Sequence, residues 1–133
     1  MFVGGSPRRS DARRPFRAEI LIVENDKAIL ESLVPILRLE GYAVTAVETG
    51  HKALQKCRLH PFDLALVNLR LSDMDGMDLI AIMHREKPGM VLVIFTGLPE
   101  EVAVHAMERG ARGFLLKPAD PGEILAMIER QLG

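Results

Sequence analysis

The sequence has only one cysteine, Cys57, among its 133 residues. A single thiol cannot build a disulfide framework within the chain, so the composition is typical of a protein that folds in a reducing cytosol. The four histidines are not spaced as metal ligands are, and we expect them on helix surfaces or in loops.

Long hydrophobic runs are missing as well. Runs such as Met90–Phe95 are far too short to cross a bilayer. The first 17 residues carry five arginines and no apolar stretch behind them, which excludes a secretory signal. Their Gly, Ser, Pro and Arg content cannot form a core, so we expect residues 1–18 to be a disordered basic tail. A basic arm for nucleic acid or a partner is the alternative for this segment.

The rest of the chain has the composition of an ordinary globular protein. Overall, 48% of the residues are hydrophobic and 26% are charged. A chain of this length can bury a core without staples, and we see no internal repeat or second domain. We therefore predict one folded domain at residues 19–133, located in the cytoplasm.

Short apolar runs alternate with stretches of helical periodicity along this domain. Apolar runs bounded by turn signals indicate buried strands, and their alternation with helices predicts an α/β protein with a parallel sheet covered on both faces. The predicted strands are Ile20–Val23, Ala43–Val47, Asp63–Asn68, Met90–Phe95 and Gly113–Leu116.

Polar residues follow most of these strands, and the stretch Phe62–Gly76 (FDLALVNLRLSDMDG) is the most informative case. The apolar run Leu64–Val67 ends in Asn68. In open parallel sheets, ligands bind at the carboxyl ends of the strands. A carboxylate, two amides, a hydroxyl and an ammonium are therefore expected in one pocket. These groups belong to Glu24, Asn25, Asn68, Thr96 and Lys117.

From about Glu19 to Leu132 the sequence resembles the receiver domains of bacterial two-component response regulators, the CheY-like superfamily. The resemblance rests on ILIVEND, FDLALVNLRLSDMDG, VLVIFTG and GARGFLLKP, in this order. It implies a three-layer, flavodoxin-like (βα)5 fold, doubly wound, with five parallel strands in the order 2-1-3-4-5. It also implies that a histidine kinase phosphorylates the aspartate which most members have at the position of Asn68.

The resemblance assigns further roles around that position. The pair at Glu24 and Asn25 matches the acids that help to bind Mg²⁺, together with the backbone carbonyl of Arg70. The remaining matches are Thr96 and Lys117, which would contact the phosphoryl group, Phe114, which would change rotamer with Thr96, and Pro118, whose preceding peptide would be cis.

The chain departs from the family pattern at three positions, Asn68, Asn25 and Ser72. An amide at position 68 cannot form an acyl phosphate. Mg²⁺ prefers carboxylates and dehydrates reluctantly, so Glu24 with neutral amides should bind it weakly or not at all, and we expect no cofactor. Like charges near 4 Å repel by about 4 kcal/mol at an effective dielectric near 20. With both asparagines in place, Glu24 and Lys117 can pair in a nearly neutral pocket.

Other interpretations remain open at this point. Thr96 and Lys117 are either relics or parts of a retained switch, and Phe114 is expected in the core rather than in a switch. Asp73 or Asp75 is an alternative phosphoacceptor, although acids at a helix start usually cap it. Asp73-Met-Asp75-Gly is also similar to the DxDG motif of haloacid-dehalogenase-type phosphatases, but Asp73 lies several residues beyond the strand end.

We therefore expect a stand-alone, degenerate receiver that is not an enzyme and acts by protein–protein contact independently of phosphorylation. Its partner would be a histidine kinase or another signalling protein. The expected surface comprises the helix after Pro99, the strand Gly113–Leu116 and the last helix, because the family uses it for docking and homodimers. We expect neither membrane nor nucleic-acid binding.

Overall fold

The computed structural model describes residues 15–133, so most of the expected tail at residues 1–18 lies outside the described part. Arg17 and Ala18 already belong to the packed domain. The Arg17 backbone N–H donates to the Gly41 carbonyl at 2.7 Å, and Ala18 is buried. The folded domain therefore includes Arg17 and Ala18, which precede its expected start at residue 19.

Five strands and five helices alternate along residues 15–133, as the apolar pattern predicts. They are β1 (Glu19–Val23), α1 (Lys27–Leu39), β2 (Ala43–Val47), α2 (Gly50–Leu59), β3 (Leu64–Val67), α3 (Gly76–Glu86), β4 (Val91–Thr96), α4 (Glu100–Glu108), β5 (Gly113–Leu116) and α5 (Pro121–Leu132).

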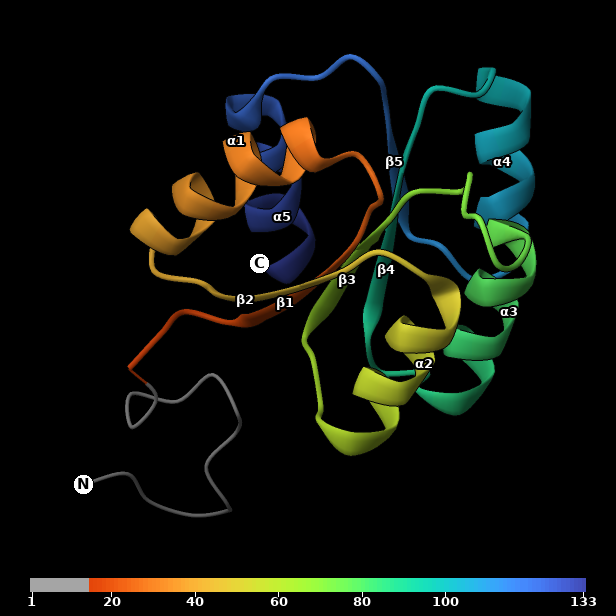
Figure 1. Ribbon diagram of the computed structural model, residues 1–133, viewed down its shortest axis with the longest axis horizontal. Coiled ribbons are helices and arrows are strands. Elements are labelled where there is room, and N and C mark those ends of the chain that lie inside the picture. Colours follow the sequence, from red (N-terminus) through yellow and green to blue (C-terminus); the bar gives the residue numbers. More distant parts are fainter. Residues whose placement is uncertain (1–14) are drawn as a thin grey trace.

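All five strands are parallel and form one sheet in the order β2-β1-β3-β4-β5. Helices α1 and α5 cover one face, and α2, α3 and α4 cover the other (Figure 1). This arrangement is the predicted three-layer, flavodoxin-like fold. Because the strands are parallel, their carboxyl ends meet at one edge of the sheet.

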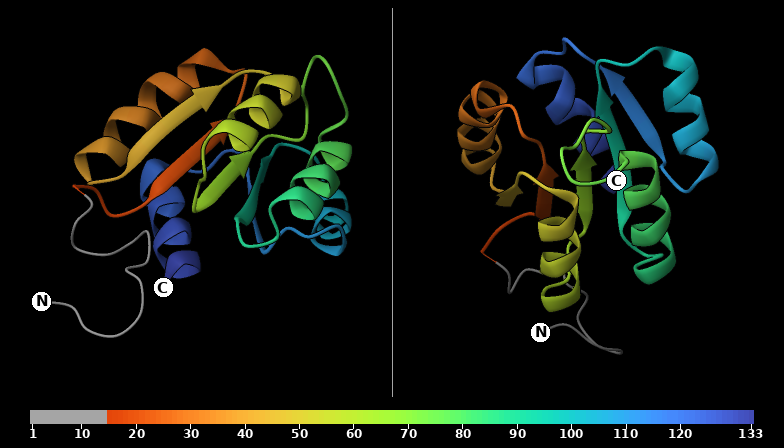
Figure 2. Two further views of the ribbon diagram at one scale, coloured as in Figure 1. Left: turned by 90° about the horizontal axis from the view of Figure 1, so that it is seen from below. Right: turned by 45° about the vertical axis from the view of Figure 1, so that its right-hand side comes forward.

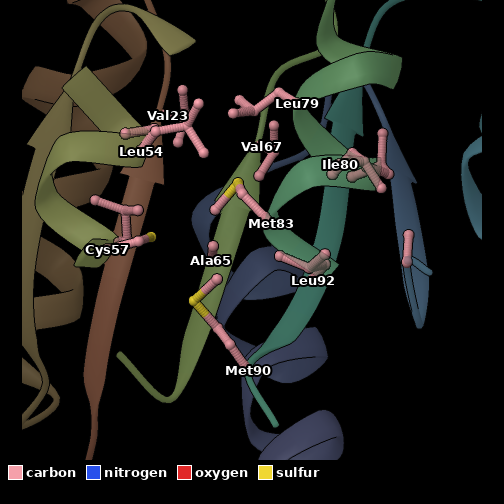
Figure 3. Packing of buried hydrophobic residues seen from close by; sticks show 14 of the residues in the cluster. Val23, Leu54, Cys57, Ala65, Val67, Leu79, Ile80, Met83, Met90 and Leu92 are labelled. Carbon is pink, nitrogen blue, oxygen red and sulfur yellow. The ribbon is translucent and has the colours of Figure 1, made fainter. Parts of the chain in front are cut away.

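Alternate residues of each strand supply the two halves of the core. In β1, Ile20 and Ile22 belong to the cluster under α1 and α5, whereas Leu21 and Val23 belong to the cluster under α2, α3 and α4. The apolar side chains of α2 and α3 close over the sheet on this second face (Figure 3). Cys57 of α2 is among them, and its burial raises the pKa of the thiol to about 11, as fits an inert core residue.

Three strands differ from their predicted bounds. The first was expected at Ile20–Val23 and is Glu19–Val23. The third strand was expected at Asp63–Asn68 and is Leu64–Val67, and the fourth was expected at Met90–Phe95 and is Val91–Thr96. Asp63 directly precedes β3, and its carboxylate accepts the Glu19 N–H at 2.7 Å. Thr96 is included because it pairs with Leu116 and its carbonyl accepts the Lys117 N–H.

Helix caps fix the loops that join these elements. Asp26 caps α1 by accepting the N–H groups of Ala28 and Ile29, and Asp120 forms a capping box with Glu123 at the start of α5. Both caps lie in loops that leave the carboxyl edge of the sheet. Between residues 15 and 133, no helix has the length and apolar character that a membrane crossing requires.

Candidate functional site

Three polar side chains are buried among the described residues: Glu24, Asn68 and Thr96. Their exposed fractions are 1%, 6% and 0%, and each stands at the carboxyl end of a strand. Buried polar groups require hydrogen-bond partners, because an unpaired one costs about 1–3 kcal/mol. The partners of these three side chains define the candidate site.

The Asn68 side chain is bonded to three residues, two in the turn after β1 and one in the turn after β3. Its amide nitrogen Nδ2 lies 3.1 Å from Glu24 Oε2, 3.1 Å from Asn25 Oδ1 and 3.2 Å from the carbonyl oxygen of Arg70. Its Oδ1 accepts the Arg70 N–H at 3.2 Å. The amide therefore connects the ends of β1 and β3 and closes the first turn of the following loop.

Lys117 completes this network from the end of β5. Its Nζ donates to Glu24 Oε1 at 2.8 Å and lies 5.0 Å from the centre of the Phe95 ring. Glu24 Oε2 also accepts the Asp26 N–H at 3.0 Å. The single buried carboxylate is thus balanced by a single ammonium, and the pocket carries no net charge.

The remaining predicted residues lie outside this network. The Thr96 hydroxyl accepts the Leu98 N–H at 3.0 Å, within its own turn. Phe114 is half-buried and packs against the cluster under α2, α3 and α4. The Lys117–Pro118 peptide is cis. The structure therefore brings Glu24, Asn25, Asn68 and Lys117 into contact, whereas Thr96 and Phe114 have separate partners.

The residues at the sheet edge do not fit a resident Mg²⁺ ion. The only carboxylate in the network is Glu24, and both of its oxygens already accept hydrogen bonds. The other two candidate ligand oxygens, Asn25 Oδ1 and the Arg70 carbonyl, accept bonds from Asn68. Nowhere in residues 15–133 do three His, Cys, Asp or Glu side chains form a group that could hold a metal ion.

Asp73 has a role that sequence reasoning missed. Its two carboxylate oxygens accept the backbone N–H groups of Gly50 and His51 at 2.9 Å each, and Oδ2 lies 2.5 Å from His51 Nδ1. The N–H groups of His51 and Gly50 hold the pKa of this carboxyl at about 2, against an ordinary value of 3.8. Asp73 thus fastens the β3–α3 loop to the amino end of α2.

The β3–α3 loop projects beyond the carboxyl edge of the sheet (Figure 2). Asp75 caps α3 by accepting the Met77 N–H at 2.8 Å, and Arg70 and Asp75 form an antiparallel bridge across the loop. A Cβ atom on Gly76 would lie 2.4 Å from the Leu69 carbonyl oxygen, so only glycine permits this close approach. The acids of the loop are therefore engaged in structural hydrogen bonds.

Comparisons with known proteins agree on one family. The family profile described as "Response regulator receiver domain" matches residues 20–129. A CheY-like response regulator receiver domain protein from Methanospirillum hungatei JF-1 superposes with a TM-score of 0.83 at 37% identity, over 86% of this chain and 93% of that one. The BeF₃-activated DrrB receiver domain superposes with a TM-score of 0.79 at 26% identity, over 86% of this chain and 97% of that one.

Curated relatives include transcriptional regulatory proteins that are longer than this chain. GlrR of Escherichia coli K12 is 35% identical over 118 residues, which are 86% of this chain and 26% of GlrR. The acid tolerance regulatory protein ActR of Rhizobium meliloti is 33% identical over 115 residues, 86% of this chain and 59% of ActR. The chain thus spans about a quarter to three fifths of these relatives. From its sequence and its fold, the chain belongs to the family of response regulator receiver domains of two-component systems.

Proposed function

We propose that this receiver domain does not accept a phosphoryl group at the usual position and that it acts through protein contacts independent of phosphorylation. The observation that carries the proposal is Asn68, bonded through its amide nitrogen to Glu24, Asn25 and Arg70. Formation of an acyl phosphate requires attack by a carboxylate oxygen. The Asn68 side chain offers a neutral amide, and Lys117, the cation that would meet a phosphoryl group, is paired with Glu24.

Two observations support this proposal over phosphorylation at a loop aspartate. Both oxygens of Asp73 accept hydrogen bonds, and these bonds lower the pKa of its carboxyl group. Because the hydrogen bonds stabilise the carboxylate anion, it is a weak nucleophile. Asp75 uses Oδ1 to cap α3. Position argues against a phosphatase-like reaction, because the DxDG motif requires its first aspartate at a strand end. Asp73 lies six residues beyond Val67, the end of β3.

The partner in this proposal is a protein, either a histidine kinase or another signalling protein, and a second copy of the chain is included. The proposed surface is formed by α4, β5 and α5. Val104 of α4 and Leu116 of β5 support it, because they are two of the four large hydrophobic side chains that are exposed among the described residues. Apolar side chains left in water on adjacent elements favour association.

Incubation with acetyl phosphate and Mg²⁺, followed by intact mass measurement, tests the proposal. We expect no phosphoryl adduct on the wild-type protein. The double variant N25D/N68D restores both acids and serves as the positive control. A stoichiometric adduct on the wild-type protein would contradict the proposal, and its loss in D73N or D75N would identify a loop acceptor.

A further inference from the structure

Three oxygen atoms from two segments, the turn after β1 and the turn after β3, surround one nitrogen atom at the carboxyl edge of the sheet. The nitrogen is Asn68 Nδ2, and the oxygens belong to the Glu24 carboxylate, the Asn25 amide and the Arg70 carbonyl. An amide nitrogen has two hydrogens, which here are shared among three acceptors. The distances of 3.1 Å to 3.2 Å are those of ordinary N–H···O hydrogen bonds.

A cluster of oxygens around a positively polarised centre is the arrangement that a divalent cation would otherwise stabilise. We propose that the Asn68 amide nitrogen takes the place of a divalent cation in this pocket, and that its presence, rather than the missing charge at Asn25, is what excludes the cation. This inference rests on the proposed function, since it explains how the pocket is stable without metal or phosphate.

The arrangement determines the space and the charge that a cation would meet in the pocket. Mg²⁺ binds oxygens at about 2.0–2.1 Å, so it cannot share the centre of the cluster with a nitrogen that the same oxygens contact at more than 3 Å. The Glu24 charge is already balanced by Lys117 at 2.8 Å.

Two variants with equal charge separate occupancy from charge. N68D replaces the amide nitrogen by an oxygen, so that a second carboxylate faces Glu24 Oε2. N25D adds the same single charge in the same pocket, but the Asn68 amide still lies among the oxygens. If charge alone excluded the cation, both variants would bind it equally. If the amide excludes it, only N68D gains a site.

The experiment is a titration of the full chain with Mn²⁺, followed by water proton relaxation, and with Mg²⁺, followed by calorimetry. We expect no binding by the wild-type protein over the range that saturates N68D, and affinity in N68D about tenfold or more above that of N25D. Thermal unfolding gives a second measure, because only a protein that binds Mg²⁺ when folded is stabilised by it. The Tm of N68D should rise with Mg²⁺, that of N25D should rise less at the same Mg²⁺ concentration, and that of the wild type should stay constant.

A further pair of variants keeps the test decisive if N68D folds poorly. N25D/N68A has the same charge as N25D but lacks the amide, so it should bind Mn²⁺ more tightly than N25D. Equal affinities of N25D and either amide-free variant would overturn the inference, and so would Mn²⁺ binding by the wild type as tight as that of N68D. Such a result would leave the proposed function intact, because the absence of a phosphoryl adduct is measured separately.

Discussion

Glu24 is the only charged side chain that is buried among the described residues. Its charge is balanced by one cation, Lys117. Removing one member of a buried ion pair leaves the other uncompensated and costs about 3 kcal/mol or more. Lys117 retains 21% exposure, so water can partly replace its partner. We expect E24Q and K117M each to lower the free energy of unfolding by about 2–3 kcal/mol, measured by urea denaturation.

The double variant E24Q/K117M provides the internal check. Because neither charge is then left unpaired, its loss of stability should be smaller than the sum of the two single losses. The exposed pair of Arg58 and Glu86, at 2.7 Å, is the matched surface control, and E86Q should change stability much less. Additive effects of E24Q and K117M would show that the pair is not coupled.

The sequence predicted the roles of those individual residues that directly follow a buried strand. Asn68 was identified because a buried apolar run stops there, and the pairing of Glu24 with Lys117 followed from counting charges in one pocket. The contacts of the Asn68 amide with Asn25 and Arg70 were not predicted. These contacts depend on the side-chain rotamer of Asn68 and on the conformation of the turn after β3. Residue type and spacing do not predict either of them.

At the scale of elements, Asp73 joins the β3–α3 loop to the start of α2. Its pKa of about 2 lies below the ordinary value of 3.8, so the folded state favours the ionised carboxylate. This contribution to stability is complete above about pH 4 and is lost as the pH falls through about 2. We expect D73N, measured by thermal unfolding, to lower the Tm at neutral pH.

The pH dependence distinguishes this carboxylate from a merely well-packed side chain. The difference in Tm between the wild type and D73N should be constant from neutral pH to about pH 4 and should disappear near pH 2. D78N is the control, since Asp78 lies on the same part of the chain and its carboxylate is 3.6 Å from Arg109 on the surface. A difference for D73N that persisted unchanged at pH 2 would contradict the role of the charge.

The order of elements was predictable, whereas the contacts between loops were not. Apolar runs such as Leu64–Val67 and the helix signals between them gave five strand–helix units. Alternation alone also implied a parallel sheet with both faces covered. The link from Asp73 to His51 joins residues 22 positions apart, one in the β3–α3 loop and the other in the first turn of α2. Only the strand order, which brings this loop and the start of α2 to the same edge, makes that link possible.

At the scale of the whole molecule, the polar network joins strands that are distant in sequence. Glu24 follows β1, Asn68 follows β3 and Lys117 follows β5, and their side chains form one connected set of hydrogen bonds. Because the Glu24 carboxylate is paired with Lys117 and position 68 carries a neutral amide, the hydrogen bonds of the set are complete without an added group. Under the proposed function, the domain would present one constant surface to its partners, and regulation would depend on whether the partner is present.

The location of that surface can be tested with four exposed hydrophobic residues in two groups. Val104 and Leu116 lie on α4 and β5, which pack together, and are 46% and 38% exposed. Leu39 and Leu59 are the last residues of α1 and α2, before the amino ends of β2 and β3, and are 86% and 78% exposed. Exposure alone would therefore favour the second group as a contact site, whereas the proposed surface requires the first.

We expect V104E and L116E to weaken self-association in sedimentation equilibrium, because a charge at an apolar contact must be desolvated without a partner. L39E and L59E should leave it unchanged. All four substitutions are on the surface, so each should alter stability by no more than about 0.5 kcal/mol, which urea denaturation verifies. Dissociation by L39E or L59E would instead place the contact at the ends of α1 and α2. A wild-type protein that stays monomeric at all concentrations would refute the homodimer. The same variants would then test contact with a different protein.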